Sequence, residues 1–483
     1  MRFGVLALAA ALSLTAWSQD DVAQLYAEAR QAQAAGDLPA AVQKYEAIVK
    51  LRPQMAEAYA NLGNLYYQQG QTDRARNAYQ KAIELKPGLA GPHFFLGVIA
   101  FGAHDYRSAV DHLRRADALQ PSNPQIHAHL GYAEYGQSNY RSAAAEFEKA
   151  AILDPAAVDV FYHLSKSYGQ LAKESFVQLK KRFPDSPYTD LARAHAAEAQ
   201  EDWKVASEQY GQALRKMPDN VRLKEKARWA AAKAADPAAP AEPTASDEWI
   251  DASLAYKDAQ LSGPDLKNAM EHFRTMTGGS EKGVQGDQAV YRAAEAYQVL
   301  SYLASLEVYE LDPDSYRAHQ LRAQFLEASN KDEEAIAEYR KVISRNPEVQ
   351  NIHFAIGTLY WKDQHLQEAR GELEAELRLN PNHPDALYEL GDIAAFSGDT
   401  QVAEKYFLAA LRLRPNLLEA HYGLEKICTQ SGRYQQSLDH LRKVLSIDPS
   451  EATAHYRLAA VYRKMGRPAD AEKELAIFND KRR

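Results

Sequence analysis

Histidine is the side chain whose spacing in this sequence most directly suggests chemistry. Six of the 15 histidines form three pairs whose members are 34 residues apart: His93 with His127, His319 with His353, and His421 with His455. Neutral imidazole is a common metal ligand, so a recurring histidine raises the hypothesis of a metal site. Zinc needs its ligands to converge within about 2 Å of one ion. The hypothesis therefore depends on how far apart the fold places successive histidines.

Motifs of known enzyme classes are missing from the sequence. There is no zincin HExxH, no phosphate loop ending in GK[ST], no GxSxG elbow and no CxxC. The nearest approach to a phosphate loop is "GGSEKG" at 278–283, which lacks the Lys-Ser/Thr pair and a preceding strand, and we interpret it as a loop. We predict no catalytic residues, no cofactor and no enzymatic activity. The alternative is an unrecognised enzyme in residues 248–315, where only His272 and the nearby His319 are histidines.

Composition favours helix and gives no indication of nucleic-acid binding. The 483 residues are 46% hydrophobic and 25% charged, alanine is abundant and β-branched residues are sparse. The 57 Lys and Arg against 65 Asp and Glu leave a net charge of -8 without any basic block. Cys428 is the single cysteine, which excludes an intramolecular disulfide, and its apolar flanks predict a buried, unreactive thiol.

The N-terminus has the pattern of a secretory signal peptide. Arg2 precedes the apolar run "FGVLALAAALSL", and "AWS" places small residues before a cut after Ser18. The run is shorter than the roughly 20 residues that span a membrane, and no later segment qualifies, so we predict no membrane span. No cysteine follows the run to carry a lipid. We expect residues 1–18 to be removed and the mature chain to be periplasmic or extracellular; an uncleaved anchor is the alternative.

A repeat of 34 residues organises most of the chain. Proline recurs at this step in two series, Pro53, Pro87, Pro121 and Pro155, then Pro313, Pro347, Pro381, Pro415 and Pro449. Between prolines the apolar residues have helical spacing in two runs, which are separated by turn sequences such as "QQG", "FSG" and "QSG". A fixed period of this length indicates stacked structural units. Each unit is predicted to be a helical hairpin.

Small residues at fixed positions predict where the two helices of a hairpin cross. The eighth position of the unit is glycine or alanine, for example Gly63, Gly97 and Gly131, and the twentieth is alanine, for example Ala75 and Ala109. Glycine inside a helix costs about 1 kcal/mol relative to alanine, so its recurrence implies a close approach there. The twenty-fourth position carries Tyr, Phe or Leu, which we expect to fill the space between helices.

This pattern closely resembles the tetratricopeptide repeat, over residues 22–157, 187–220 and 316–483. The resemblance implies an all-α, right-handed superhelical solenoid of stacked antiparallel helical hairpins without catalytic activity. The first helix of each hairpin would line a concave groove that binds extended peptides or partner domains. We divide the chain into the signal peptide, an N-terminal block at 22–235 with a degenerate hairpin at 158–186, a Pro/Ala-rich linker at 236–248, a divergent helical segment at 249–315, and a C-terminal block at 316–483.

The repeat answers the question about histidine. All six histidines occupy the fourth position of a unit, and stacked hairpins place equivalent positions roughly 10 Å apart. One histidine in each unit cannot form a metal site. We predict that these histidines are partly buried packing residues and that the protein holds no metal.

Aromatic residues are the better indication of function. The resemblance places the second, fifth, ninth, twelfth and thirteenth positions on the concave side, a spacing that also forms one stripe on a helix. Aromatic side chains anchor interfaces because they bury a large area at small entropic cost. The predicted partner-binding residues are Tyr26, Tyr67, Phe94, Phe101, Tyr132, Tyr135, Tyr162, Phe354, Trp361, Tyr388, Tyr422 and Tyr456.

Two ligand classes and one structural explanation remain open for this row. We expect a protein or peptide ligand, so that the chain acts as an interaction scaffold. Aromatic side chains also stack on sugar rings, so envelope polysaccharide is the alternative ligand. Tetratricopeptide repeats tolerate tyrosine at the fifth position, so part of the row could serve helix packing alone.

Overall fold

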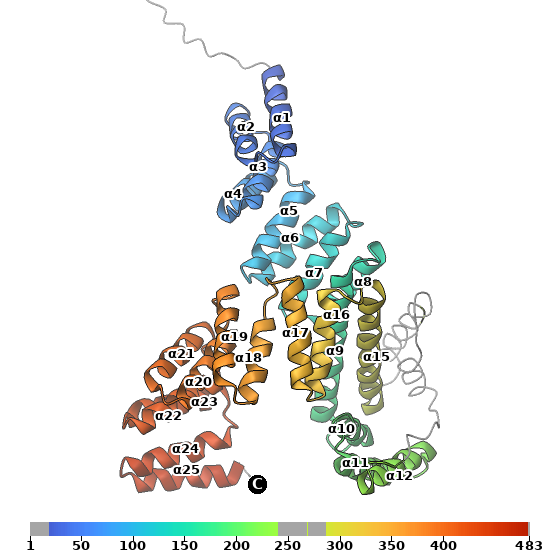
Figure 1. The fold of residues 1–483 in the computed structure, drawn as a ribbon, viewed down its shortest axis with the longest axis vertical. Coiled ribbons are helices and arrows are strands. Elements are labelled where there is room, and N and C mark those ends of the chain that lie inside the picture. The colour runs from blue at the N-terminus through green and yellow to red at the C-terminus, as the bar shows by residue number, and fades with distance from the viewer. Residues whose placement is uncertain (1–18, 240–267, 269–285, 482–483) are drawn as a thin grey trace, which may run out of the picture. The chain divides into compact units, whose positions relative to one another are not determined.

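A computed structural model describes residues 19–239, 268 and 286–481, and within these ranges all regular structure is α-helix (Figure 1). Contacts between residues divide the chain into unit 1, which ends at Asp312, and unit 2, which begins at Pro313. The signal peptide, most of the predicted linker and most of the divergent segment at 249–315 lie outside the described residues. None of the described helices is long and apolar enough to cross a membrane.

Unit 1 is built from consecutive helical hairpins and one helix that follows a long insertion. Its helices are α1 (Gln19–Ala34), α2 (Leu38–Leu51), α3 (Ala56–Gln68), α4 (Thr72–Leu85), α5 (Ala90–Gly102), α6 (Tyr106–Leu119), α7 (Pro124–Gly136), α8 (Tyr140–Leu153), α9 (Val158–Arg182), α10 (Pro187–Ala199), α11 (Trp203–Lys216), α12 (Val221–Ala235) and α15 (Asp287–Leu311).

Unit 2 consists of five hairpins in direct succession. Its helices are α16 (Tyr316–Ala328), α17 (Asp332–Arg345), α18 (Ile352–Lys362), α19 (Leu366–Leu379), α20 (Pro384–Phe396), α21 (Thr400–Leu413), α22 (Leu418–Gln430), α23 (Tyr434–Ile447), α24 (Ala452–Lys464) and α25 (Pro468–Lys481). The predicted fold class, an all-α solenoid of stacked antiparallel helical hairpins, is confirmed in both units.

The turn within a hairpin needs one residue in the left-handed conformation. Between α3 and α4 this residue is Gly70, with φ +70°. Glycine adopts this conformation without the steric cost that a Cβ adds. The next helix starts at once, and the side chain of Asp37, which precedes α2, accepts a hydrogen bond from the first turn of that helix (Ala40 N, 3.0 Å).

The close approach of helices predicted from the small residues is present in the structure. A Cβ on Gly63 would lie 2.6 Å from Tyr79 Cε1, and one on Gly131 would lie 2.5 Å from Phe147 Cε1. Tyr79 and Phe147 are both 0% exposed. The ring at position 24 therefore lies directly on the backbone of the glycine at position 8, which explains why glycine recurs there despite its cost to the helix.

In unit 2 one ring connects two hairpins. Phe407 of α21 packs against Gly391 of its own hairpin, and its far edge packs against Gly423 of α22, where a Cβ would lie 2.6 Å from the ring. The α22–α23 hairpin itself departs from the small-residue rule, because Glu425 and Ser437 occupy its eighth and twentieth positions. Both are buried, and Glu425 forms an ion pair with Arg457 of the next hairpin (2.9 Å).

Residues 158–186 do not form the degenerate hairpin that we expected. Residues Val158–Arg182 form the single 25-residue helix α9, and its antiparallel partner is α15, also 25 residues long (Figure 1). Buried apolar residues recur along the whole of α9, among them Leu164, Leu171 and Leu179, so that no point in the sequence favours a turn. The hairpin is closed by a segment about one hundred residues further along the chain.

The insertion between α9 and α15 contains a repeat of its own. Helices α10 and α11 form a hairpin, on which α12 packs, and α10 contacts both long helices. Ser186 at the start of α10 donates to Asp287 Oδ2 at the start of α15 (2.6 Å). Tyr188 packs on Tyr291, with ring centroids 5.4 Å apart. The inserted hairpin is thereby attached to the end of the long pair.

Two glycines of unit 2 allow a matched test of the ring-on-glycine contact. Gly391→Ala would drive a methyl group to 2.7 Å from Phe407 Cδ1, so we expect a loss of roughly 1–3 kcal/mol from overpacking. Gly371, within α19, has no atom within 4 Å of the added Cβ, and Gly371→Ala should gain up to about 1 kcal/mol from helix propensity. Urea unfolding followed by circular dichroism measures both changes. Equal effects of the two variants would contradict the contact.

Candidate functional site

The first helices of successive hairpins lie on the inner side of each stack. In unit 1, α3 contacts α5, α5 contacts α7, and α7 contacts α9; in unit 2, α18 contacts α20 and α20 contacts α22. Among the described residues no pair of successive second helices reaches comparable contact. Helices that approach one another more closely must lie on the concave face of a curved stack. Side chains on this face can contact one ligand from several hairpins at once.

In unit 1 the inner helices carry a continuous series of ring contacts, which we call the unit 1 row. It runs from Tyr67 on α3 to Tyr162 on α9. Successive centroid distances are 5.4 Å for Tyr67–Phe95, 5.2 Å for Phe95–Phe94, 5.0 Å for Phe94–His129, 5.7 Å for His129–Tyr132, 4.7 Å for Tyr132–His163 and 5.1 Å for His163–Tyr162.

Three members of the unit 1 row were not predicted. Phe95, His129 and His163 occupy the sixth position of their units, beside the fifth position that we had considered. They are spaced at 34 residues, so the repeat itself would have revealed them. The Nδ1–H of His129 donates to the carbonyl of Gln125 (2.8 Å), and burial lowers the pKa of its imidazole. His129 is therefore a neutral, aromatic member of the row.

The predicted residues of unit 1 differ in how much surface they offer. Tyr67, Phe94, Phe101 and Tyr132 are partly buried, whereas Tyr162 is only 4% exposed. Tyr162 therefore offers little area to a partner. Within the unit 1 row, Tyr162 packs against the neighbouring ring and supports it.

Tyr26 and Tyr135 lie on the inner helices but pack on the second helices. Tyr26 meets Tyr45 edge to face at 5.4 Å and accepts a hydrogen bond from Asn61 Nδ2 (2.5 Å). Tyr135 packs on Tyr140 at 5.1 Å, and burial raises the pKa of its hydroxyl. Both contribute to hairpin packing as well as to the inner face.

In unit 2 the aromatic side chains form separate pairs, which we call the unit 2 row. The pairs are Phe354 with His383 (4.8 Å), Trp361 with Phe396 (5.4 Å), Tyr388 with Phe407 (5.8 Å) and Tyr456 with Phe478 (5.4 Å), while Arg457 lies 4.7 Å above the ring of Tyr422. Phe396 is 63% exposed and Tyr456 54%. Phe396, at the thirteenth position, is a further residue that we missed.

Charge distinguishes the two rows. Helix α5 carries no acidic or basic residue apart from His93, and Glu57 of α3 is paired with Lys86 (2.7 Å). In unit 2, by contrast, Glu389 on α20 lies near Asp392 of the same helix and Glu419 on α22. The part of the unit 1 row on α3 and α5 is therefore nearly uncharged, whereas the unit 2 row contains an acidic cluster on α20.

The acids of unit 2 are held in an unfavourable environment. Burial, and then the charges of Asp392, Asp385 and Glu419, raise the pKa of Glu389 to about 7. Burial also raises the pKa of Asp392, and Lys426 partly opposes this. Within the part of unit 2 that is described, the Glu389 carboxyl has neither an ion pair nor a hydrogen bond to another side chain. A positively charged ligand would relieve this repulsion.

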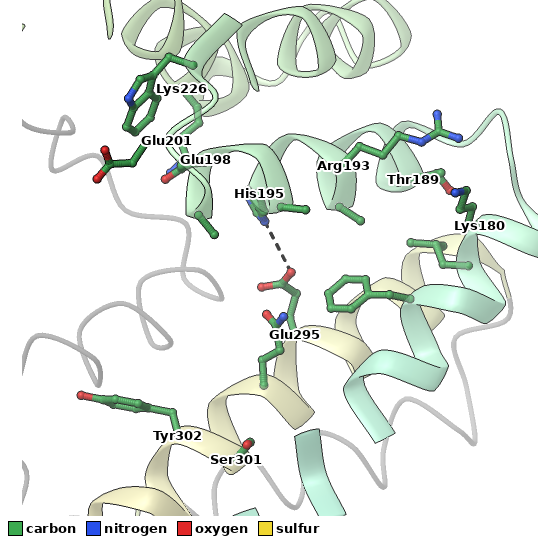
Figure 2. A pocket seen from close by; sticks show the side chains of 17 residues that line it. Lys180, Thr189, Arg193, His195, Glu198, Glu201, Lys226, Glu295, Ser301 and Tyr302 are labelled. Atoms are coloured by element: carbon green, nitrogen blue, oxygen red, sulfur yellow. Dashed lines mark hydrogen bonds and ion pairs between the residues drawn. The ribbon is translucent and has the colours of Figure 1, made fainter. Parts of the chain in front are cut away.

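A cavity of about 940 Å³ lies beside the long pair of unit 1 (Figure 2). Its lining comes mainly from α9, α10 and α15, and in Figure 2 His195 of α10 points toward Glu295 of α15, 3.6 Å away. Charges of both signs surround it, including Lys180 and Arg193. The described residues contain no group of three or more His, Cys, Asp or Glu that could hold a metal ion. We assign no chemistry to this cavity.

Sequence profiles described as "Tetratricopeptide repeat" match residues 56–89, 96–158, 316–349 and 354–417, and one described as "TPR repeat" matches 34–70 and 426–466. Together these matches cover more than half of the chain. The chain belongs to the tetratricopeptide repeat family. No curated protein matches it in sequence.

Several solved tetratricopeptide repeat structures are similar to parts or all of this one. A structure of MamA is 21% identical, covers 33% of this chain and 94% of its own, and has a TM-score of 0.32. YrrB, described as a TPR protein with an unusual peptide-binding site, is 22% identical, with 37% and 91% covered and a TM-score of 0.32. The Cut9–Hcn1 complex is 14% identical, with 96% and 94% covered and a TM-score of 0.34.

The buried acid of unit 2 should make stability fall as pH rises. The pKa of Glu389 is about 7 in the folded protein against an ordinary 4.5, so the folded state keeps a proton that the unfolded state has lost. Stability is therefore lost between about pH 4.5 and 7. Glu389→Gln should gain on the order of 1 kcal/mol at pH 8, after a discount for partial exposure, and nothing at pH 4.

Urea unfolding at the two pH values measures this difference. The exposed Glu472, changed to Gln, is the matched control and should have the same effect at both. A Glu389→Gln effect that is equal at pH 4 and pH 8 would rule out a strained carboxylate at this site.

Proposed function

We propose that this protein is a non-catalytic scaffold or assembly factor, exported from the cytoplasm, that binds extended segments of partner proteins along its two aromatic rows. Membership of the tetratricopeptide repeat family supports a role in protein–protein interaction. The observation that carries the groove proposal is the series of ring contacts along the inner helices of unit 1. Rings held by one another lose little freedom on binding, so they are favourable anchors.

The two rows favour chemically different segments. The unit 1 row is aromatic and, along α3 and α5, nearly uncharged, which fits an apolar segment whose backbone can bond to tyrosine hydroxyls. The unit 2 row combines exposed rings with Glu389 and Asp392, which fits a segment that carries Lys or Arg. We propose that each unit holds its own segment, either from two partners or from two parts of one.

Export is proposed from the N-terminal sequence alone. Arg2, the apolar run at 3–14 and the small residues before Ser18 form the three parts of a signal peptide. The partners would then be proteins of the cell envelope or the extracellular space.

The unit 1 row can be tested by truncating two partly buried rings: Tyr67, its first member, and Phe101, which packs on its member Tyr132 with ring centroids 6.3 Å apart. Protein carrying Tyr67→Ala and Phe101→Ala should lose partners that the wild type captures from an envelope fraction, because truncation of an anchoring aromatic side chain costs roughly 1–4 kcal/mol of binding. Mass spectrometry identifies the partners, and titration of each purified partner gives the affinity ratio, which should be tenfold or more.

The matched control is Ile152→Ala with Val221→Ala, two apolar residues that are 73% and 65% exposed and lie outside the row. This variant should bind like the wild type. Unchanged capture by the Tyr67/Phe101 variant, with circular dichroism showing it folded, would eliminate the unit 1 row as a binding surface. Binding of purified wild type to envelope polysaccharide, lost in the same variant, would favour the sugar ligand instead.

Export predicts a defined mature N-terminus. When the full chain is produced in a bacterial host, the protein recovered from the periplasm or medium should begin at Gln19, and Leu6→Arg, which interrupts the apolar run, should leave the precursor in the cytoplasm. N-terminal sequencing and fractionation measure both. A wild-type protein that stays in the cytoplasm with residues 1–18 attached would show that the segment is not a signal peptide.

A further inference from the structure

Each of the six recurring histidines meets the residue 19 positions later, on the second helix of its own hairpin. In four hairpins this residue is glutamate, and Nδ1 contacts the carboxylate: His127–Glu146 at 2.8 Å, and His319–Glu338, His353–Glu372 and His455–Glu474 each at 2.6 Å. In the other two it is a second histidine, with Nδ1–Nδ1 distances of 3.4 Å for His93–His112 and 3.1 Å for His421–His440. The same place in the fold thus has two different chemistries.

The hydrogen bonds of His421 determine which nitrogen carries its proton. Its Nε2 lies 3.1 Å from the carbonyl of Pro415, and because a carbonyl only accepts, Nε2 must carry the hydrogen. In the neutral ring Nδ1 is then bare, and it accepts a hydrogen bond from Nδ1–H of His440. His93 is likewise hydrogen-bonded to the backbone of Pro87, so His112 is its donor.

This arrangement can take up one proton but not two. A first proton on Nε2 of His440 leaves the Nδ1–H to Nδ1 bond in place. A second proton must go to Nδ1 of His421, which sets two N–H groups against each other at 3.1 Å and places two positive charges side by side. His421 is only 7% exposed and His93 only 3%, so water cannot screen these charges well.

Neighbouring charges do not compensate for the second proton. Around the α22–α23 pair stand Asp439, Lys443, Arg433 and Glu404, and the last two are paired with each other at 2.7 Å. Around the α5–α6 pair stand Asp111 and Arg115. Burial, and then the partner or adjacent cations, lower the pKa of all four imidazoles below its ordinary value.

Histidine paired with glutamate has a different geometry. In His127 both ring nitrogens face acceptors, Glu146 on one side and the Pro121 carbonyl at 2.9 Å on the other. Two N–H groups are therefore never set against each other in such a pair. The contrast comes from the residue at position 23 alone.

We propose that the α5–α6 and α22–α23 hairpins, one in each unit, are sensitive to acid. At mildly acidic pH the two helices of each of these hairpins separate, while the hairpins that contain a His–Glu pair stay folded. A histidine whose folded pKa lies below its unfolded value binds fewer protons when folded, so stability is lost as pH falls below about 6.5. These two hairpins are next to the aromatic rows of their units, because Phe94 and Tyr422 directly follow His93 and His421. Release of a partner at acidic pH would follow, and only that consequence depends on the proposed function.

Hydrogen exchange of the free protein tests the proposal without any partner. We expect amide protection, corrected for intrinsic exchange rates, to fall at least tenfold between pH 7.5 and 5 in peptides from α5–α6 and α22–α23. Peptides from α7–α8 and α24–α25, closed by His127–Glu146 and His455–Glu474, are the internal control and should keep their protection.

Two substitutions separate titration of the pair from other effects of acid. His440→Glu converts the pair to the type found in four other hairpins and should abolish the loss in α22–α23 while leaving that in α5–α6 unchanged. His440→Gln removes the second titrating ring, and its amide can either donate to the bare Nδ1 of neutral His421 or turn its Oε1 to accept from the protonated ring. It should therefore also abolish the loss, which keeps the test valid if the glutamate variant folds poorly. Equal protection in all hairpins at pH 5, or a loss that persists in His440→Gln, would overturn the proposal.

Discussion

The contact of a large side chain at position 24, which is tyrosine, phenylalanine or leucine, with the small residue at position 8 is the constraint on which the solenoid depends. Phe407 lies between Gly391 and Gly423, so one side chain sets both the crossing within its hairpin and the distance to the next one. Because interiors are close-packed, a methyl group at this point must displace a helix. The repeated distance is what brings the inner helices together and lines up side chains from successive units.

Each hairpin requires two helices whose apolar faces are complementary. The two helices need not follow one another directly in the chain. The α9–α15 pair is closed by residues about one hundred positions apart, yet it presents Tyr162 and His163 at the place where the unit 1 row continues. Ser165 and Ser305 contact each other across this pair through their hydroxyls (2.7 Å), and Ser301 Oγ donates to the Ser165 carbonyl (2.9 Å). Small hydroxylated residues allow these long helices to approach closely, as glycine does elsewhere.

The sequence was sufficient to predict the repeat, the points at which the two helices of a hairpin cross, and most of the aromatic residues on the inner helices, because these depend on local spacing. It predicted Tyr67 as an inner-face residue, and in the structure Tyr67 packs on Phe95, while its neighbour Tyr66 is only 5% exposed with its hydroxyl bonded to Glu46 (2.7 Å). The partner of α9 could not be predicted, since nothing local identifies which of the later helices has the complementary face. The glutamate or histidine opposite each recurring histidine was missed because that pairing joins two helices and follows neither helical period.

The two aromatic rows differ in charge, so the inner faces of the two units are not copies of one surface. A carboxyl with a raised pKa, such as that of Glu389, weakens the folded state at neutral pH, and a solenoid could replace it with an uncharged residue without changing any hairpin contact. Unit 1 does this at the position equivalent to Glu389, where Asn61, Phe95, His129 and His163 stand in successive hairpins. Charges that cost stability and serve no packing are characteristic of binding sites, where a ligand of opposite charge restores what the free protein loses.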